Sequence, residues 1–173
     1  MYYNLETNID ITAQNVVKLL SNAGLRAATA ESCTGGLISA AITSVGGSSD
    51  VFDLGICTYA NSAKSRFLAV PEEMLSKYGA VSESVAIAMC RGIQRAADSD
   101  FGLSVTGIAG PSGGTAEKPV GTVFIGLSTR TEAFAERFLF KTDGCPENMS
   151  ERNFIRMQTV KAALSMLEKK LKP

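Results

Sequence analysis

The segment LRAATAESCTGGLISAAITSV, residues 25–45, predicts a strand, a turn and a helix in direct succession. Residues 25–30 form a short apolar run, and apolar residues recur at helical spacing from Leu37 onward. The hexapeptide ESCTGG at 31–36 therefore lies on a strand-to-helix turn. Open α/β sheets place their ligands at such turns, so this segment indicates both the fold class and the first candidate site.

Strands and helices alternate along the rest of the chain. Glycine-rich and proline-rich stretches separate them. The expected elements are a helix that Asp10 caps and Gly24 ends, a second buried strand at 54–59, a short helix capped by Asn61, a helical turn opened by Pro71, a helix from Ser82, a strand at 101–105, a hairpin of strands at 120–129 and 133–140, and a last helix from about Ser150. We predict one three-layer α/β/α domain over residues 1–173, with a mixed sheet of about five strands.

Composition excludes several kinds of chemistry. The chain has 173 residues, 17 Lys and Arg against 17 Asp and Glu, and no His. Without histidine, Ser-His-Asp catalysis, Cys-His catalysis and His-ligated zinc are all excluded. Any general base must be Lys, Asp, Glu or Tyr. Because the chain has no basic excess, we expect no nucleic-acid partner.

The cysteines and the amino terminus indicate the compartment. Cys33, Cys57, Cys90 and Cys145 are widely spaced and form no CxxC pair, which is typical of reduced thiols rather than of a disulfide frame or a metal site. No basic segment followed by an apolar stretch opens the chain, and no apolar run approaches the ~20 residues of a membrane span. We expect a cytoplasmic protein with no membrane partner.

ESCTGG offers a candidate nucleophile. Ser32 comes just before a helix whose first amides are unpaired, and Gly35 and Gly36 allow a substrate to approach the backbone. Nearby N–H groups can then hold the oxyanion that forms when Ser32 attacks a carbonyl. Two alternatives stay open. Ser32 or Thr34 can simply cap the helix, and Cys33 is a rival nucleophile because thiolates at helix amino termini are activated.

TYANSAK at 58–64 offers a candidate base. A strand end followed by one helical turn brings Tyr59 and Lys64 to the same neighbourhood. With no histidine available, Lys64 is the natural base, provided that burial lowers its pKa toward neutrality. The alternative is a solvated surface lysine, which is the commoner environment for this residue type.

TGIAGPSGG, from Thr106 to Gly114, has too many Gly and Pro residues for regular structure. It is neither a Walker loop, because no GK[ST] follows, nor a Rossmann fingerprint, because the glycine spacing differs. Its backbone amides can bind a phosphate or a carboxylate as a nest.

Jointly these segments resemble a known family. The matching motifs are ESCTGG, then Val51, Phe52, Gly55, Tyr59, Asn61, Ala63 and Lys64, then AVSESVA at 80–86 and VTGIAGPSGGTAEKPVGTV at 105–123. In this order they closely resemble the CinA carboxy-terminal domain family, which includes the stand-alone nicotinamide-nucleotide amidohydrolases.

The resemblance implies a bacterial cytosolic deamidase that converts nicotinamide mononucleotide to nicotinate mononucleotide and ammonia without a cofactor or metal. It also implies an anticodon-binding-domain-like fold and a homo-oligomer, with a dimer favoured. The implied nucleophile is Ser32, and the assisting groups are Tyr59, Lys64 and Thr106. The candidate substrate-binding residues are Cys33, Thr34, Gly35, Gly36, Asn61, Gly107, Gly110, Gly113, Gly114, Arg152 and Arg156.

The chain departs from the family pattern before its last helix. Where family members usually carry Gly-Asp-Arg, this chain has Ser150, Glu151 and Arg152. This departure bears on substrate preference more than on fold. Two alternatives to the nicotinamide-nucleotide hypothesis stay open: hydrolysis of a different amide, and a catalytically silent nucleotide-binding or partner-binding module linked to competence or DNA damage.

Overall fold

A five-stranded sheet forms the centre of the computed structural model, which describes residues 2–172 and the side chains from residue 5 onward. Its strands are β1 (Ala27–Glu31), β2 (Phe52–Cys57), β3 (Phe101–Gly107), β4 (Thr122–Ser128) and β5 (Ala133–Leu139). They lie in the order β2-β1-β3-β4-β5. β1 is parallel to β2 and β3, whereas β4 is antiparallel to both β3 and β5. The predicted mixed sheet and its late hairpin are confirmed.

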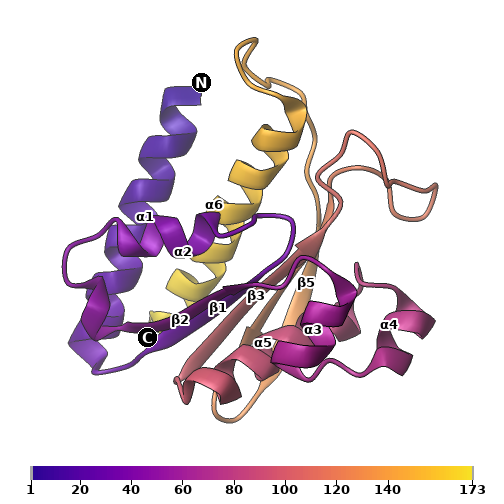
Figure 1. Ribbon diagram of the computed structural model, residues 1–173. Helices are drawn as coiled ribbons and strands as arrows, with labels where there is room; N and C mark the ends of the chain where they lie inside the picture. Colours follow the sequence, from indigo (N-terminus) through magenta and orange to yellow (C-terminus); the bar gives the residue numbers. More distant parts are fainter. Residues whose placement is uncertain (1, 173) are drawn as a thin grey trace.

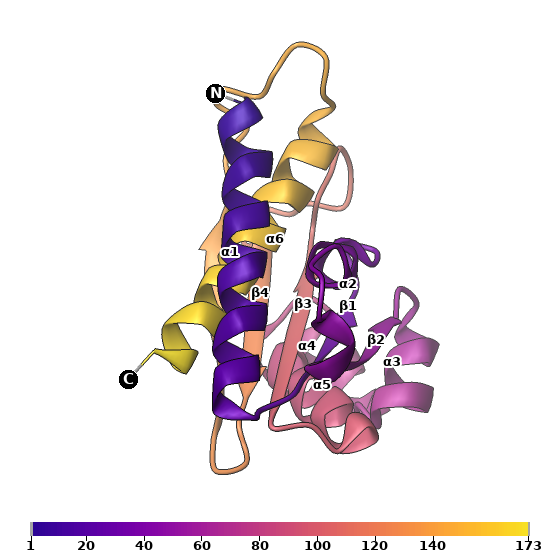
Figure 2. The same cartoon turned by 90° about the vertical axis from the view of Figure 1, so that its left-hand side faces the viewer.

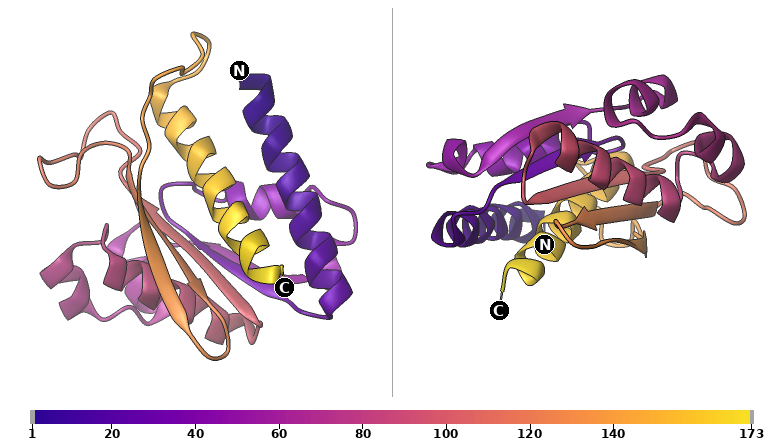
Figure 3. Two further views of the ribbon diagram at one scale, coloured as in Figure 1. Left: turned by 180° about the vertical axis from the view of Figure 1, so that it is seen from behind. Right: turned by 90° about the horizontal axis from the view of Figure 1, so that it is seen from below.

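Helices cover both faces of the sheet (Figures 1 and 2). The helices of one face are α1 (Tyr2–Ala23), α2 (Leu37–Thr43) and α6 (Glu151–Leu171), and those of the other are α3 (Asn61–Leu68), α4 (Glu72–Tyr78) and α5 (Glu83–Ala97). Figure 3 shows from below how the sheet separates the two helical layers. The predicted three-layer α/β/α arrangement is therefore confirmed.

Strand alternation sends side chains into two separate cores. On one face, Leu103, Val105 and their neighbours pack with α1, α2 and α6, and on the other face Ala28 and Ala30 pack against α5. Helix α5 lies unusually close to β4. A Cβ at Gly126 would be 2.6 Å from the Ala86 carbonyl oxygen, so only glycine allows this approach.

The helix starts predicted at Pro71, Ser82 and Ser150 are correct, and the caps predicted at Asp10 and Asn61 are wrong. Ser82 and Ser150 cap α5 and α6, because their hydroxyls accept hydrogen bonds from amides three residues on. Asn61 is instead the first residue of α3 and provides no side-chain cap. Asp10 lies inside α1, which starts at Tyr2 because the apolar stripe continues back through Leu5 into the core.

The strand predicted at 54–59 is not buried. β2 is an edge strand that pairs only with β1, and Leu54 is 36% exposed. An apolar run does not show whether a strand is central or at an edge, because that depends on how the chain crosses over afterwards. Within residues 2–172, no helix combines the length and apolarity that crossing a membrane requires.

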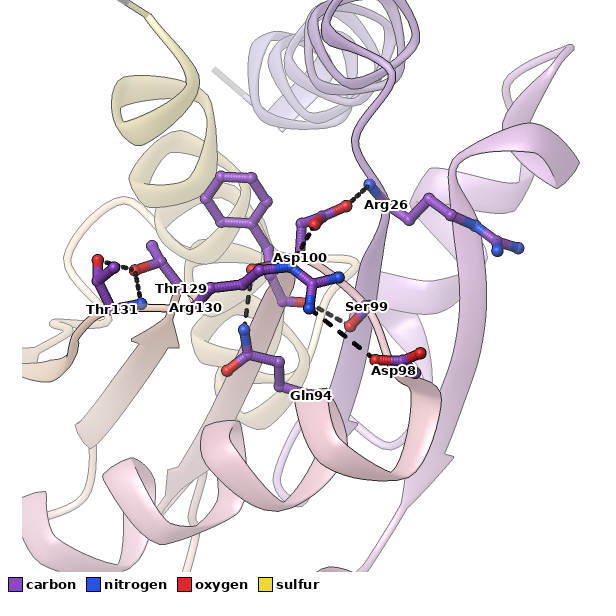
Figure 4. A network of polar contacts seen from close by, with 9 residues as sticks. Arg26, Gln94, Asp98, Ser99, Asp100, Thr129, Arg130 and Thr131 are labelled. Carbon is purple, nitrogen blue, oxygen red and sulfur yellow. Dashed lines mark hydrogen bonds and ion pairs between the residues drawn. The ribbon is translucent and has the colours of Figure 1, made fainter.

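A polar network ties together the strand starts at the sheet end opposite ESCTGG (Figure 4). Asp100, just before β3, accepts a hydrogen bond from the Arg26 amide at 2.9 Å and one from Arg130 Nε at 2.8 Å. Gln94 Nε2 on α5 donates to the Asp100 carbonyl at 2.9 Å. The network thus joins the beginnings of β1 and β3 to the β4–β5 turn.

We expect Asp100→Asn to lower the free energy of unfolding by about 1–2 kcal/mol at pH 7. Burial raises the pKa of Asp100, but the hydrogen bonds and charges of Arg130 and Arg26 outweigh it, so the pKa lies below its usual 3.8. The wild type should therefore be more stable than Asp100→Asn above pH ~4. This difference in the free energy of unfolding should shrink as pH falls through the lowered pKa of Asp100. Denaturant unfolding of both proteins from pH 7 to pH 3 checks this, and a difference that did not shrink in acid would contradict it.

Candidate active site

All three chemistry-bearing segments meet at the carboxyl ends of the parallel strands. Ser32 directly follows β1, Tyr59 follows β2 by two residues, and Thr106 lies near the end of β3. They open into a cavity of about 330 Å³. The cavity is lined by Ser32, Cys33, Tyr59, Asn61, Lys64, Ala80, Val81, Thr106, Gly107, Ile108, Ala109, Gly110, Ser112, Gly113 and Arg152.

Lys64 faces the Ser32 hydroxyl inside this cavity. Its Nζ lies 3.2 Å from Ser32 Oγ, 2.8 Å from the Thr58 carbonyl oxygen and 3.2 Å from the Tyr59 carbonyl oxygen. A neutral amine has two N–H donors and one lone pair. In this neutral form the two carbonyls take both donors and the lone pair faces the Ser32 hydroxyl proton, whereas in the charged form the third N–H donates to Ser32 Oγ. The neutral form is the arrangement of a serine with a lysine general base.

Burial of Lys64 disfavours its charged form. Its side chain is 1% exposed, and no ion pair among the described residues includes it. Burial lowers the pKa of Lys64 below its usual 10.5. The alternative of a solvated surface lysine is therefore wrong. α3 carries Lys64 inward because its next turn buries Leu68 against α5.

Tyr59 and Thr106 stand at different depths in the cavity. Thr106 is buried and its hydroxyl donates to the Ala80 carbonyl at 2.9 Å. Tyr59 is 62% exposed, and its hydroxyl accepts a hydrogen bond from Arg152 Nη2 at 3.0 Å. A second bond from Arg152, to the Gly110 carbonyl, joins the mouth of the cavity to the glycine-rich loop, which Figure 1 shows projecting beyond the sheet between β3 and β4.

Cys33 lines the same cavity, but its thiol is not activated. Burial raises the pKa of Cys33 to about 12, with a further contribution from the Glu31 charge, while its own backbone amide and Arg156 act in the opposite direction. A thiol with this pKa carries almost no thiolate near pH 7. The described residues offer Lys64 to Ser32 as a base, and they bond no base to Cys33.

Glu31 caps α2. This role was not expected from the sequence. The carboxylate is fully buried and accepts hydrogen bonds from the amides of Gly36, Ile38 and Ser39 at 2.8–3.1 Å and from the Ser39 hydroxyl at 2.7 Å. The alternative that Ser32 or Thr34 caps this helix is therefore wrong. A glutamate five residues before the capped amide lies outside the usual capping patterns, so no sequence signal could have found it.

This cap also changes the expected oxyanion donors. The Gly36 amide is bonded to Glu31, and the Gly35 amide donates to the Ser32 carbonyl at 3.1 Å. Both glycines adopt positive φ values, which shapes the turn. These two amides are consequently not free to hold an oxyanion, contrary to the expectation from ESCTGG.

The two arginines of α6 differ in position. Arg152 lines the cavity, whereas Arg156 donates to the carbonyls of Cys33 and Thr34 at 3.2 and 2.8 Å. Arg156 thus holds the nucleophile turn from the α6 side and does not face the cavity. Of the other candidate substrate-binding residues, Cys33, Asn61, Gly107, Gly110 and Gly113 line the cavity, and Thr34, Gly35, Gly36 and Gly114 do not.

Part of the cavity wall comes from residues that were not singled out individually from the sequence. Ala80 and Val81 close it from the segment before α5, and Ile108, Ala109 and Ser112 belong to the glycine-rich loop. The only signal for Ala80 and Val81 was their place in AVSESVA. A hollow of about 400 Å³ between α1 and α6 contains the Ser165 hydroxyl, but no described residue bonds a base to it. Groups of three acidic or cysteine residues suited to a metal are also absent from residues 2–172.

Comparison with known proteins gives a consistent family match. A family model described as the CinA C-terminal domain matches residues 9–171. The chain is 47% identical over 158 residues to a CinA-like protein of Kosmotoga olearia, covering 91% of this chain and 36% of that protein. It is also 47% identical over 156 residues to a CinA-like protein of Geobacter sulfurreducens, covering 90% and 36%. The chain thus spans 36% of the length of these curated relatives.

Solved structures agree with the observed fold. The competence/damage inducible protein CihA of Agrobacterium tumefaciens has a TM-score of 0.87 at 41% identity, covering 95% of each chain. A competence-damaged protein (CinA) superfamily protein of Klebsiella pneumoniae has a TM-score of 0.86 at 31% identity, covering 94% of this chain and 97% of that one.

Proposed function

The chain belongs to the CinA C-terminal domain family, and from this premise we propose that it is an amidohydrolase that converts nicotinamide mononucleotide to nicotinate mononucleotide and ammonia. The observation that carries the proposal is the bond geometry of Lys64. Its Nζ lies 3.2 Å from Ser32 Oγ, and it donates hydrogen bonds to the carbonyl oxygens of Thr58 and Tyr59. The family resemblance supplies the substrate, and this serine-lysine pair supplies the chemistry.

In the first half of the proposed reaction, Ser32 Oγ attacks the carboxamide carbon as neutral Lys64 takes the hydroxyl proton. A C–O bond forms, and the carbonyl π electrons move to oxygen to give a tetrahedral oxyanion. Because the Gly35 and Gly36 amides and the Thr106 hydroxyl already donate hydrogen bonds, we assign the oxyanion to the Cys33 amide beside the nucleophile, which donates none of the described hydrogen bonds.

In the second half, the Lys64 ammonium gives its proton to the departing nitrogen. The C–N bond breaks, ammonia leaves, and the nicotinate carbonyl remains as an ester on Ser32. Water then attacks this ester with Lys64 again as base, which frees the acid and regenerates the Ser32 hydroxyl. Each step uses only residues of this chain and water.

We assign the substrate phosphate to the mouth of the cavity. There the Arg152 guanidinium lies against the Gly110 carbonyl and the Tyr59 hydroxyl, beside a loop with backbone amides and Ser112. A guanidinium can bind a phosphate through two parallel charge-assisted hydrogen bonds. Arg156 is not part of this assignment, because its donors engage Cys33, Thr34 and Asn153.

We expect Arg152→Ala to raise KM for nicotinamide mononucleotide by about 10–100-fold, the loss of a charge-assisted phosphate contact. The matched substrate is nicotinamide riboside, which lacks the phosphate. Steady-state kinetics on both substrates should show a large change in KM for the nucleotide and a small one for the riboside. Equal changes for the two would remove Arg152 from the phosphate site.

The proposed activity is tested by ammonia release from nicotinamide mononucleotide by the purified chain, with and without a chelator. Chelator-resistant release supports the proposal. Calorimetry against a panel of pyridine nucleotides separates the alternatives when no ammonia appears. Nucleotide binding without turnover would favour a silent module, and absence of binding would favour a different amide.

A further inference from the structure

Strand alternation places Glu31 and Ser32 on opposite faces of the sheet. Ser32 faces Lys64 of α3, and Glu31 faces α2. Between them the backbone is held in the ladder, since the Ser32 amide donates to the Val105 carbonyl and the Thr58 amide donates to the Glu31 carbonyl. The side chains of Glu31 and Ser32 therefore leave one fixed stretch of backbone in opposite directions.

The Glu31 carboxylate accepts four hydrogen bonds and has no cationic partner among the described ion pairs. Its bonds to Gly36, Ile38 and Ser39 fix the start of α2. Ser39 continues the network, because its hydroxyl lies 2.8 Å from the Thr29 hydroxyl on β1. The turn that carries Ser32 and Cys33 is thus held at both ends, by β1 and by α2.

Resting on the proposed function, we propose that Glu31 is a positioning residue that aligns Ser32 with its base and, together with burial, keeps the adjacent Cys33 a neutral thiol, so that serine and not cysteine is the nucleophile. Glu31 touches no cavity space and acts only through the turn. Its negative charge opposes a thiolate two residues away, and its acceptors occupy the helix amides that would otherwise stabilise one.

Three ionisable groups lie around Cys33, each on a different element. Glu31 on β1 raises the pKa of the thiol and Arg156 on α6 lowers it. Lys64 on α3 lines the same cavity as Cys33. Glu31 is the only anion of the three. Its neutralisation therefore leaves the Arg156 cation unopposed beside Cys33, and the thiolate fraction at a fixed pH should rise.

The test compares Glu31→Gln with Ser39→Ala. Glu31→Gln removes the charge and weakens the cap, whereas Ser39→Ala loosens the same turn and keeps the charge. Ammonia release gives kcat and KM. Iodoacetamide labelling at pH 8, followed at Cys33 by peptide mass spectrometry, measures the thiolate without requiring any activity.

We expect both variants to lose kcat, by at least about tenfold for Glu31→Gln, with KM for the nucleotide changed less than about threefold. Cys33 labelling should rise at least about fivefold in Glu31→Gln and stay near wild type in Ser39→Ala. Unchanged kcat in both variants, or equal labelling in both, would overturn the proposal. If Glu31→Gln does not fold, the kcat of Ser39→Ala decides whether this turn positions Ser32.

The two readouts keep this proposal separate from the proposed function. A wild type that releases no ammonia defeats the amidohydrolase assignment, while the Cys33 labelling rates still decide whether Glu31 controls the thiol. Conversely, an active wild type with unaltered variants defeats the role of Glu31 and leaves the amidohydrolase assignment intact.

Discussion

Ser32→Ala is expected to reduce kcat for ammonia release from nicotinamide mononucleotide by about a thousandfold or more, because the variant has no atom that can form the covalent ester. KM or the dissociation constant for the nucleotide should change little, since Ser32 contributes one small hydroxyl to a cavity lined by many other groups. Steady-state kinetics with calorimetry of the same protein preparation measures both quantities.

The matched control is Cys33→Ala, one residue along the same turn. Cys33 lines the cavity, but its thiol is neutral near pH 7 and no described base is bonded to it. We expect Cys33→Ala to keep at least about a third of wild-type kcat, the range of a small change in packing near a site. The reverse pattern, with Cys33→Ala inactive and Ser32→Ala active, would make cysteine the nucleophile.

Local patterns were sufficient for most of the fold. Alternation of apolar strands and helices predicted the layers, and serine caps marked the starts of α5 and α6. The same patterns could not position β2 at an edge. They also placed the start of α1 at Asp10 instead of Tyr2. The packing of Leu5 depends on contacts between α1 and α6, which comes from the far end of the chain.

The candidate site could also be predicted only in part. Ser32, Tyr59, Lys64 and Thr106 could be predicted to converge, because they follow the carboxyl ends of parallel strands. Neither the Glu31 cap nor the Arg156 bonds could be predicted. Each depends on where a long side chain points after distant elements have packed, and Arg156 reaches a turn more than a hundred residues away.

Lys64→Met is expected to lower kcat by about 10²–10⁴-fold, the usual contribution of a general base. Methionine keeps most of the buried volume, so loss of folding is not the expected cause. Lys64→Arg should be equally inactive, because a guanidinium cannot give up its proton to serve as a base. Lys141→Met, an exposed lysine outside the cavity, is the matched control and should have wild-type kinetics.

The pH dependence of the wild type tests the charge state that this mechanism needs. Only the neutral amine can take the Ser32 proton, so kcat/KM should rise with pH through the pKa of Lys64 in the free enzyme. Because burial lowers that pKa, the rise should come below the usual lysine value of 10.5. An assay of kcat/KM from pH 5 to pH 10 locates it. A rate that began to rise only near the ordinary lysine pKa would mean that Lys64 is a permanent cation, and the bond to Ser32 would then hold the hydroxyl without activating it.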